Sequence, residues 1–148
     1  MKYRSTKTYG NERGLSAVFR QWRAQSHCRF LHGYALGVHI EFEADELDEN
    51  GWVYDFGKCK WIEAFLKSTF DHRLVVALDD PDLPEFRALQ EQGLVQLTIL
   101  NNGVGCEKFA AYIFNAIQAA FKDQNETRVR VALVRVFEHG SNGAVVTA

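Results

Sequence analysis

Residues 34–44, YALGVHIEFEA, alternate between apolar side chains and other side chains along almost their whole length. The apolar set is Leu36, Val38, Ile40 and Phe42, and the opposite set is Gly37, His39, Glu41 and Glu43. A period of two residues is the pattern of a β-strand with one face in the core and the other toward water. This stretch therefore predicts a sheet that is covered by other elements on one side.

Two later segments have the period of an amphipathic helix instead. Residues 58–70, KCKWIEAFLKSTF, place large apolar side chains three and four positions apart, and residues 106–122, CEKFAAYIFNAIQAAFK, do the same in an alanine-rich context. Such a helix has one apolar stripe, and alanine favours the helical backbone. We therefore expect both helices to cover the apolar face of the sheet.

Further strands are predicted at residues 2–9 (KYRSTKTY), 94–100 (LVQLTIL) and 128–140 (RVRVALVRVFEHG). The last of these is expected to be the final strand of the chain, and because its apolar residues lie on both faces, we expect it to be central in the sheet or covered on both sides. Residues 52–56, WVYDF, are predicted to form a short strand that pairs with residues 34–44 as a hairpin across a polar turn.

The remaining segments are predicted to connect these elements. Residues 10–30 have no clear period and are expected to be a long connection, residues 71–86 a loop, and residues 86–93 one or two helical turns closed by Gly93. The order of elements predicts an α+β fold, with an antiparallel sheet and two main helices on one face. A chain of 148 residues fits a single domain spanning 1–148.

Composition narrows the functional classes. The net charge of −2 argues against a general nucleic-acid binder. Three cysteines at irregular spacing give no disulfide framework, and no stretch approaches the roughly 20 apolar residues that a membrane span needs. We expect a soluble cytoplasmic protein that binds neither nucleic acid nor membrane.

Cys28 is the first candidate for chemistry. Its neighbours Arg23, His27 and Arg29 are cationic or can become so, and cationic neighbours favour a reactive thiolate. The alternative is a cysteine that packs as a small apolar side chain. Asp71 and His72 follow the first helix, where a carboxylate can orient an imidazole for proton transfer. They can equally be a polar pair that ends the helix.

Three more residues are candidates for binding. Glu138, near the end of the last predicted strand, could accept two N–H donors from a guanidine-like ligand edge, or could simply be hydrated. Glu107 lies in the first turn of a helix, where a carboxylate also complements the free N–H groups. His32 is a candidate metal ligand, because His27, Cys28 and His39 are close to it in sequence.

Four blocks resemble motifs of the 6-pyruvoyl-tetrahydropterin synthase family, which includes the 6-carboxytetrahydropterin synthases of queuosine biosynthesis. GWVYDFGKCK at 51–60 resembles its Gly-x-Val-x-Asp-Phe-x-x-Leu-Lys block, and FDHRL at 70–74 resembles Leu-Asp-His-x-x-Leu. GCEKFAAYIF at 105–114 resembles Thr-x-Glu-x-x-Ala-x-x-Ile, and VRVFEHGSNGA at 134–144 resembles the Val-x-Val-x-Glu-Thr ending. With the Cys28 region, the resemblance covers nearly the whole chain.

The resemblance implies a tunnelling fold, in which the sheets of several subunits close into a barrel with active sites between subunits. It implies a homo-oligomer, as a hexamer or another trimer-based assembly. The implied activity is that of a lyase acting on 7,8-dihydroneopterin triphosphate, with elimination of triphosphate and rearrangement or cleavage of the side chain. Cys28 would be the acid/base, Asp71 and His72 its partners, Glu138 the pterin anchor and Glu107 a second pterin contact.

The family's zinc site uses three histidines, and this chain departs from it. His32 matches one ligand, Tyr34 stands where the second histidine is expected, and Asn11 is the candidate for the place of the first. Two interpretations follow. In the first, zinc is absent, and the chain is a pterin enzyme with altered metal use or a non-catalytic oligomer that binds a pterin or purine. In the second, zinc is held by a rearranged set of ligands. The candidates for that set are His32, Cys28, His27 and His39.

The segment before Cys28 is rich in arginine. Its cationic side chains are Arg13, Arg20, Arg23 and Arg29. Guanidinium groups bind phosphate oxygens well, so these residues could receive the triphosphate. A hydrated charged loop is the alternative.

Overall fold

The computed structural model describes all 148 residues, as seven strands and three α-helices. The strands are β1 (Tyr3–Tyr9), β2 (Leu15–Phe19), β3 (His32–Ala44), β4 (Arg73–Ala77), β5 (Leu97–Leu100), β6 (Arg130–His139) and β7 (Asn142–Thr147). The helices are α1 (Lys60–Phe70), α2 (Leu83–Glu91) and α3 (Cys106–Asp123). Three short 3₁₀ turns lie at η1 (Asn11–Arg13), η2 (His27–Arg29) and η3 (Phe56–Cys59). The α+β prediction is confirmed.

The long strand β3 organises the sheet. Its C-terminal part pairs with β1 and its N-terminal part with β2, while β6 pairs along its other edge and β7 pairs with β6, all antiparallel. Beyond β2, the pairs β2–β4 and β4–β5 are parallel. The antiparallel sheet that the sequence predicts is thus extended at one end by two parallel pairs.

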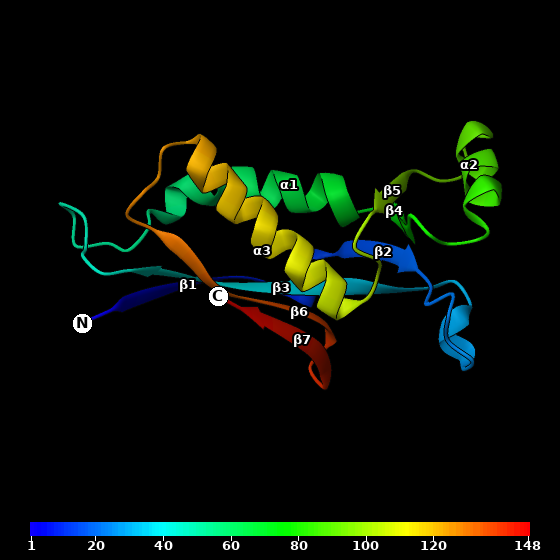
Figure 1. Ribbon diagram of the computed structural model, residues 1–148, viewed down its shortest axis with the longest axis horizontal. Coiled ribbons are helices and arrows are strands. Elements are labelled where there is room, and N and C mark those ends of the chain that lie inside the picture. The colour runs from blue at the N-terminus through cyan, green and yellow to red at the C-terminus, as the bar shows by residue number, and fades with distance from the viewer.

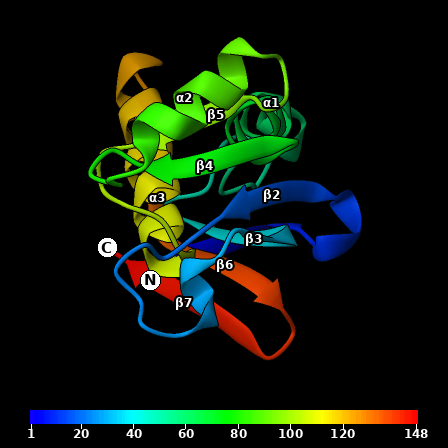
Figure 2. The same ribbon diagram turned by 90° about the vertical axis from the view of Figure 1, so that its right-hand side faces the viewer.

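Helices α1 and α3 both lie on one side of the β1–β3–β6–β7 part of the sheet, and α2 lies at the far end beside β4 and β5 (Figures 1 and 2). The side chains of Leu36, Val38, Ile40 and Phe42 are at most 1% exposed. They belong to a core cluster of 29 buried residues that also includes α1 and α3 side chains. The predicted orientation of β3 and the predicted role of the two helices are therefore confirmed.

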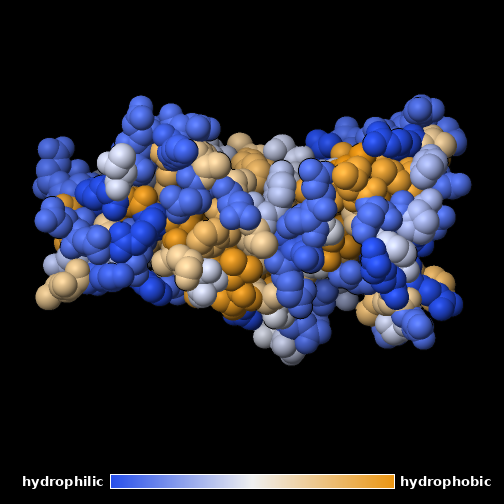
Figure 3. All heavy atoms as spheres, in the orientation of Figure 1, coloured by the Kyte–Doolittle hydropathy of each residue, from blue (hydrophilic) through white to orange (hydrophobic).

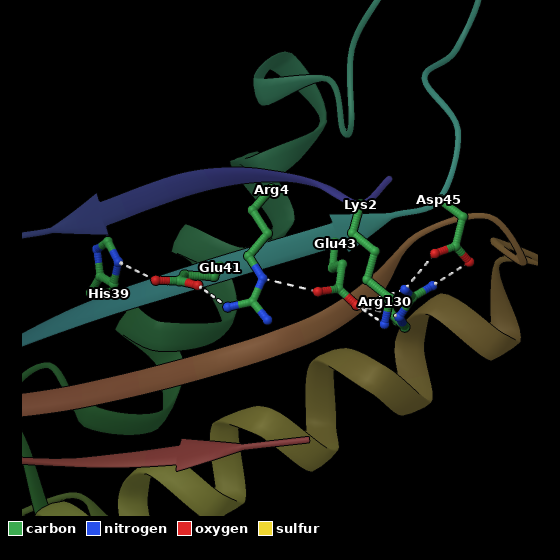
Figure 4. Close-up of polar contacts among 7 residues, drawn as sticks. All are labelled: Lys2, Arg4, His39, Glu41, Glu43, Asp45 and Arg130. Carbon is green, nitrogen blue, oxygen red and sulfur yellow. Dashed lines mark hydrogen bonds and ion pairs between the residues drawn. The ribbon is translucent and has the colours of Figure 1, made fainter.

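The opposite face of the sheet carries charge. Glu43 on β3 accepts hydrogen bonds from the Arg4 Nε atom at 2.9 Å and from the Arg130 Nη2 atom at 2.6 Å, and Lys2 lies 3.5 Å away (Figure 4). Arg130 on β6 lies on one side of Glu43, and Arg4 on β1 and Lys2 just before β1 lie on the other. Their charges and hydrogen bonds hold the pKa of Glu43 below its usual value. Glu43 is only 6% exposed, so this pairing offsets the cost of burying a carboxylate.

The prediction of a strand at 52–56 is wrong. Residues 52–55 are bends and irregular backbone with no strand partner, and Val53 and Tyr54 are both buried in the core cluster. The Arg128 guanidinium donates to the carbonyls of Trp52, Val53 and Glu46, so a side chain binds the acceptors that a partner strand would use. The segment is a loop that leads into η3.

Three other expectations need correction. Residues 71–86 contain β4, whose last four residues are all buried, because the strand lies between β2 and β5. Residues 10–30 contain β2, in which buried and exposed residues alternate. Residues 128–140 do form a central strand, but β7 follows it along the chain.

Helix α2 spans nine residues and starts earlier than the predicted turns, and Gly93 follows it with a φ of 74°. Apolar residues are exposed at the end of the molecule that carries α2 (Figure 3). None of the helices combines the length and apolar character needed to cross a lipid bilayer.

Candidate active site

Tyr34 marks the place where four segments of the chain meet. Burial raises the pKa of the Tyr34 hydroxyl, and the nearby Glu138 carboxylate and the thiols of Cys28 and Cys106 add to the rise. These groups come from β3, the end of β6, η2 and the start of α3. The structure therefore brings Cys28 and Glu138, which are 110 positions apart in the sequence, to one place beside Tyr34.

The loop that carries Cys28 is fixed by Gln21. The backbone N–H of Gln21 donates to the carbonyl of Cys28 at 2.9 Å, and its side-chain amide donates to the carbonyl of Val104 at 3.0 Å. A Cβ atom on Gly105 would lie 2.3 Å from the Gln21 Nε2 atom. Nothing in the sequence around Gln21 indicates this role, and the glycine directly before α3 is the only local sign of the close contact.

Cys106 and Glu107 open α3 at this site. Burial raises the pKa of the Cys106 thiol to about 11, and the carboxylates of Glu138 and Glu107 contribute to the rise. Cys106 is therefore a protonated, buried thiol. Glu107 is exposed in the first turn of the helix, close enough to Cys106 and Glu138 to share their surroundings.

His32 and Tyr34 project toward the helix-covered side of β3, and a third ring meets them there. The ring of Phe19 on β2 lies 5.4 Å from the His32 ring and 6.0 Å from the Tyr34 ring, and the His32 and Tyr34 rings are 5.5 Å apart. Phe19 is 1% exposed and packs edge-on against Phe109 of α3. The third side chain at the place of the expected metal ligands is thus Phe19.

Asn11 has other partners. Its amide nitrogen lies within hydrogen-bonding distance of three carbonyl oxygens, those of Ala35, Phe137 and Glu138, at 2.6 to 3.4 Å. This contact joins the chain after β1 to β3 and β6. Asn11 therefore braces the backbone at Glu138, a role that the sequence does not indicate.

The other candidate histidines lie apart from one another. His39 is on the open face of the sheet, where its Nδ1 atom is 2.7 Å from the Thr8 hydroxyl, and it lies seven positions after His32 along β3. Seven is an odd number, so the two side chains point to opposite faces. His27 is exposed on η2. No three histidine, cysteine, aspartate or glutamate side chains converge on one point where a metal ion could bind.

Asp71 and His72 form the pair that the sequence suggests. The His72 Nδ1 atom is 2.9 Å from the Asp71 Oδ1 atom, which also accepts from the backbone N–H of Ser16. His72 has a φ of 56°, unusual for a residue with a side chain, and its backbone N–H donates to the Ser16 carbonyl at 2.7 Å. The imidazole is 84% exposed, so the pair is fixed at the backbone and open at the ring.

Most of the arginines near the site already have carboxylate partners. Arg20 binds Asp80 and Asp82, Arg23 binds Asp79, and Arg13 lies 3.8 Å from Glu63. Arg29 stacks on the ring of Phe30 and forms no ion pair. Of the four candidates, Arg29 is therefore the one whose charge is available to a phosphate.

Comparison with known proteins places this geometry in a family. The chain matches the 6-pyruvoyl tetrahydropterin synthase family over residues 10–148. It is 30% identical to the 6-carboxy-5,6,7,8-tetrahydropterin synthase of Rickettsia typhi over 107 residues, which are 68% of this chain and 73% of that protein. It is 34% identical to a putative enzyme of the same name from Pyrococcus horikoshii over 71 residues, which are 48% of this chain and 42% of that one.

Solved structures share the fold. An uncharacterised protein of Wolinella succinogenes aligns over 99% of this chain and 98% of its own with a TM-score of 0.82 at 19% identity. The 6-pyruvoyltetrahydropterin synthase of Plasmodium vivax aligns over 100% of this chain and 98% of its own with a TM-score of 0.68 at 15% identity. The fold is the tunnelling fold, and the chain belongs to the 6-pyruvoyl tetrahydropterin synthase family.

Proposed function

We propose that the protein is a pterin-metabolising lyase that acts on 7,8-dihydroneopterin triphosphate. The observation that carries this proposal is the meeting of Cys28, Tyr34, Cys106 and Glu138. A carboxylate and a thiol near the same hydroxyl offer one group that binds a ligand and one that moves a proton. The names of the curated relatives, which are tetrahydropterin synthases, support a pterin as the ligand.

Glu138 is the proposed anchor. The amino-pyrimidinone ring of a pterin presents two adjacent N–H donors, and one carboxylate can accept both of them. The Asn11 amide, which contacts the carbonyl of Glu138, holds the backbone at this position. The Tyr34 hydroxyl is near enough to the carboxylate for Glu138 to raise the pKa of Tyr34.

Cys28 is the proposed base. In a triphosphate elimination, the base removes a proton from the carbon next to the one that bears the triphosphate. The electron pair of that C–H bond forms a carbon–carbon double bond, and the C–O bond breaks with its electrons leaving on the triphosphate. Arg29, next to Cys28 and free of carboxylates, is suited to receive the leaving group.

The Asp71–His72 pair is the proposed partner of the thiol. Within one chain the His72 imidazole hydrogen-bonds only to Asp71 and is open to solvent. We propose that a second copy of the chain brings its Cys28 to this imidazole in a homo-oligomer with a trimer-based assembly. The β1 and β7 edges, each paired on one side only, are available for such an assembly.

Triphosphate release from 7,8-dihydroneopterin triphosphate tests the proposal. We expect the parent protein to release triphosphate and Cys28→Ala to lose release while still binding the pterin. Glu138→Gln should lose pterin binding, and Glu91→Gln, on the exposed end of α2, serves as the control. The proposal is wrong if the parent protein releases no triphosphate under either condition, without added zinc or with it.

A second candidate function is binding of a pterin or purine without turnover. The observation that favours it is the pair of non-ligand rings, Phe19 and Tyr34, beside His32. It predicts that the parent protein binds a pterin tightly, that the bound compound is recovered unchanged, and that Cys28→Ala has no effect.

A further inference from the structure

We infer that the place where the family resemblance puts zinc-binding histidines at positions 32 and 34 is, in this chain, a packed cluster of rings that does not accept zinc. The cluster consists of Phe19, His32 and Tyr34. The cluster lies in the site of the proposed function, and the inference rests on that function only in that zinc would serve the proposed reaction. Zinc binding itself can be measured without substrate.

The donor atoms of the cluster do not suit zinc. Zinc sites use imidazole nitrogen, thiolate sulfur and carboxylate oxygen, usually four donors in a tetrahedron or three with a water. His32 supplies one such donor, the Phe19 ring supplies none, and the Tyr34 hydroxyl is a neutral group at neutral pH. One imidazole is not enough to hold the ion.

Packing also closes the position. The three rings are 5.4, 5.5 and 6.0 Å apart, centre to centre, in mutual contact. Phe19 cannot move aside, because it is 1% exposed and its ring lies 5.1 Å from the ring of Phe109, which is fully buried. Phe109 in turn packs on Phe70 of α1. The Phe19 ring is thus part of the core.

No rearranged set of ligands converges on His32, although Cys28 and Glu138 lie near Tyr34 and the His139 ring is 6.5 Å from the Tyr34 ring. His39 points to the opposite face of the sheet and contacts Thr8 and Glu41 there. His27 is exposed on η2, and no three ligand-type side chains converge anywhere in the chain. The interpretation in which Cys28, His27 or His39 joins His32 at a metal is therefore not supported by the geometry.

The ring nitrogens of His32 are arranged as in a histidine that binds a metal. Its Nδ1 atom lies 2.7 Å from the carbonyl of Phe30, and because a carbonyl can only accept, Nδ1 carries the proton. The Nε2 atom is then left with a free lone pair, as in histidines that bind metals. Replacing the two neighbouring rings by imidazoles should therefore complete a three-histidine site.

The experiment measures zinc in the purified protein without a histidine tag, after exposure to excess zinc and removal of loosely bound ion. The parent should hold far less than one zinc per chain. The double variant Phe19→His/Tyr34→His should hold about one, and should lose it when His32→Ala is added. Cobalt should give the double variant, and not the parent, the absorption bands of a tetrahedral site.

A matched control makes the same two changes elsewhere. Phe65 on α1 and Tyr112 on α3 have rings 6.0 Å apart, and neither helix contains a histidine. Phe65→His/Tyr112→His should gain no zinc. Far-ultraviolet circular dichroism checks that each variant is folded.

Two results would overturn the inference. One is stoichiometric zinc in the parent that disappears with His32→Ala, a measurement that needs no folded double variant. The other is a folded double variant that binds no more zinc than the control, because the rings would then not occupy a metal position. A zinc-containing parent that releases triphosphate would overturn this inference and leave the proposed function standing.

Discussion

Gly37 lies under an aromatic ring on the open face of the sheet. It pairs with Phe137, and a Cβ atom at Gly37 would lie 2.2 Å from the ring atoms of Phe137. Arg135 covers the same ring at 4.8 Å, which limits its freedom to move. We predict that Gly37→Ala lowers the free energy of unfolding by about 1–3 kcal/mol, the usual cost of overpacking.

Urea denaturation measures this change. Gly140→Ala is the control, because a Cβ atom at Gly140 meets nothing within 4 Å and its φ is not in the left-handed region. Equal midpoints for the parent and Gly37→Ala would show that Phe137 moves away without cost.

Tyr34 gives a prediction for binding. Its hydroxyl lies beside the Glu138 carboxylate. Tyr34→Phe should weaken pterin binding by about tenfold, because a hydrogen-bonding group that orients a charged group contributes on the order of 1–2 kcal/mol. The dissociation constant can be read from pterin fluorescence. Tyr112→Phe, on the half-buried face of α3, is the control, and an unchanged constant for Tyr34→Phe would remove Tyr34 from the site.

At the scale of elements, an ion pair attaches the region of α2 to β2. Arg20, at the end of β2, binds Asp80 in bidentate fashion at 2.7 and 3.0 Å. Burial disfavours the Asp80 carboxylate, but the Arg20 guanidinium and the backbone N–H of Asp82 together outweigh burial, and the pKa of Asp80 is lowered. Asp80 is 5% exposed, so its charge depends on Arg20.

Arg20→Met should therefore destabilise the fold by about 3–5 kcal/mol, because it leaves a buried charge unpaired. Arg23→Met is a matched control: Arg23 also binds an aspartate, Asp79, but both side chains are more than half exposed, and such pairs contribute about 0–1 kcal/mol. Unfolding midpoints test both values, and hydrogen exchange should show faster exchange in α2 for Arg20→Met alone. Equal losses in the two variants would contradict the prediction.

Elements with a clean period could be predicted from the sequence, and the others could not, for physical reasons. The stripes of α1 and α3 and the alternation in β3 are repeated often enough to identify them. Strand β4 is buried between parallel neighbours and shows only a short apolar run, LVVA, which no period separates from a loop. The loop at Val53 depends on Arg128, 75 positions away, so no local pattern reveals it.

The candidate site was predictable in its parts and not in its arrangement. Residue type and motif resemblance were enough to identify Cys28, Glu138 and the Asp71–His72 pair as candidates. Their convergence depends on distant contacts, such as that of Gln21 with Val104. Phe19 lies beside His32 because β2 pairs with β3, and β2 is a strand that the sequence does not identify.

For the whole molecule, buried phenols and thiols predict sensitivity to alkali. Burial raises the pKa of Tyr9, of Tyr54 and of Cys59, as it does for Cys106. In the unfolded chain these groups ionise from their ordinary values of 9.0 for cysteine and 10.0 for tyrosine. Above these values the unfolded state binds fewer protons than the folded state, so stability falls as the pH rises.

We therefore predict that the urea midpoint declines progressively from about pH 8.5 to about pH 11. Tyr9→Phe should make the decline above about pH 10 shallower, because one buried group no longer ionises on unfolding. Midpoints measured at a series of pH values test this. A slope that is the same in the variant and the parent would show that Tyr9 does not contribute.

The charges around Glu43 have a consequence for strand alignment. If β1 slipped by one residue along β3, Arg4 would turn from the open face to the side beneath the helices, so burial alone forbids that error. A slip by two residues keeps every side chain on its own face, and burial does not detect it. In one direction such a slip brings Thr6 opposite Glu43 and leaves this nearly buried carboxylate without the Arg4 cation, whereas in the other direction Lys2 comes opposite Glu43 and Arg4 comes opposite Glu41. The charges around Glu43 thus disfavour one of the two slips by two residues that the hydrophobic pattern permits.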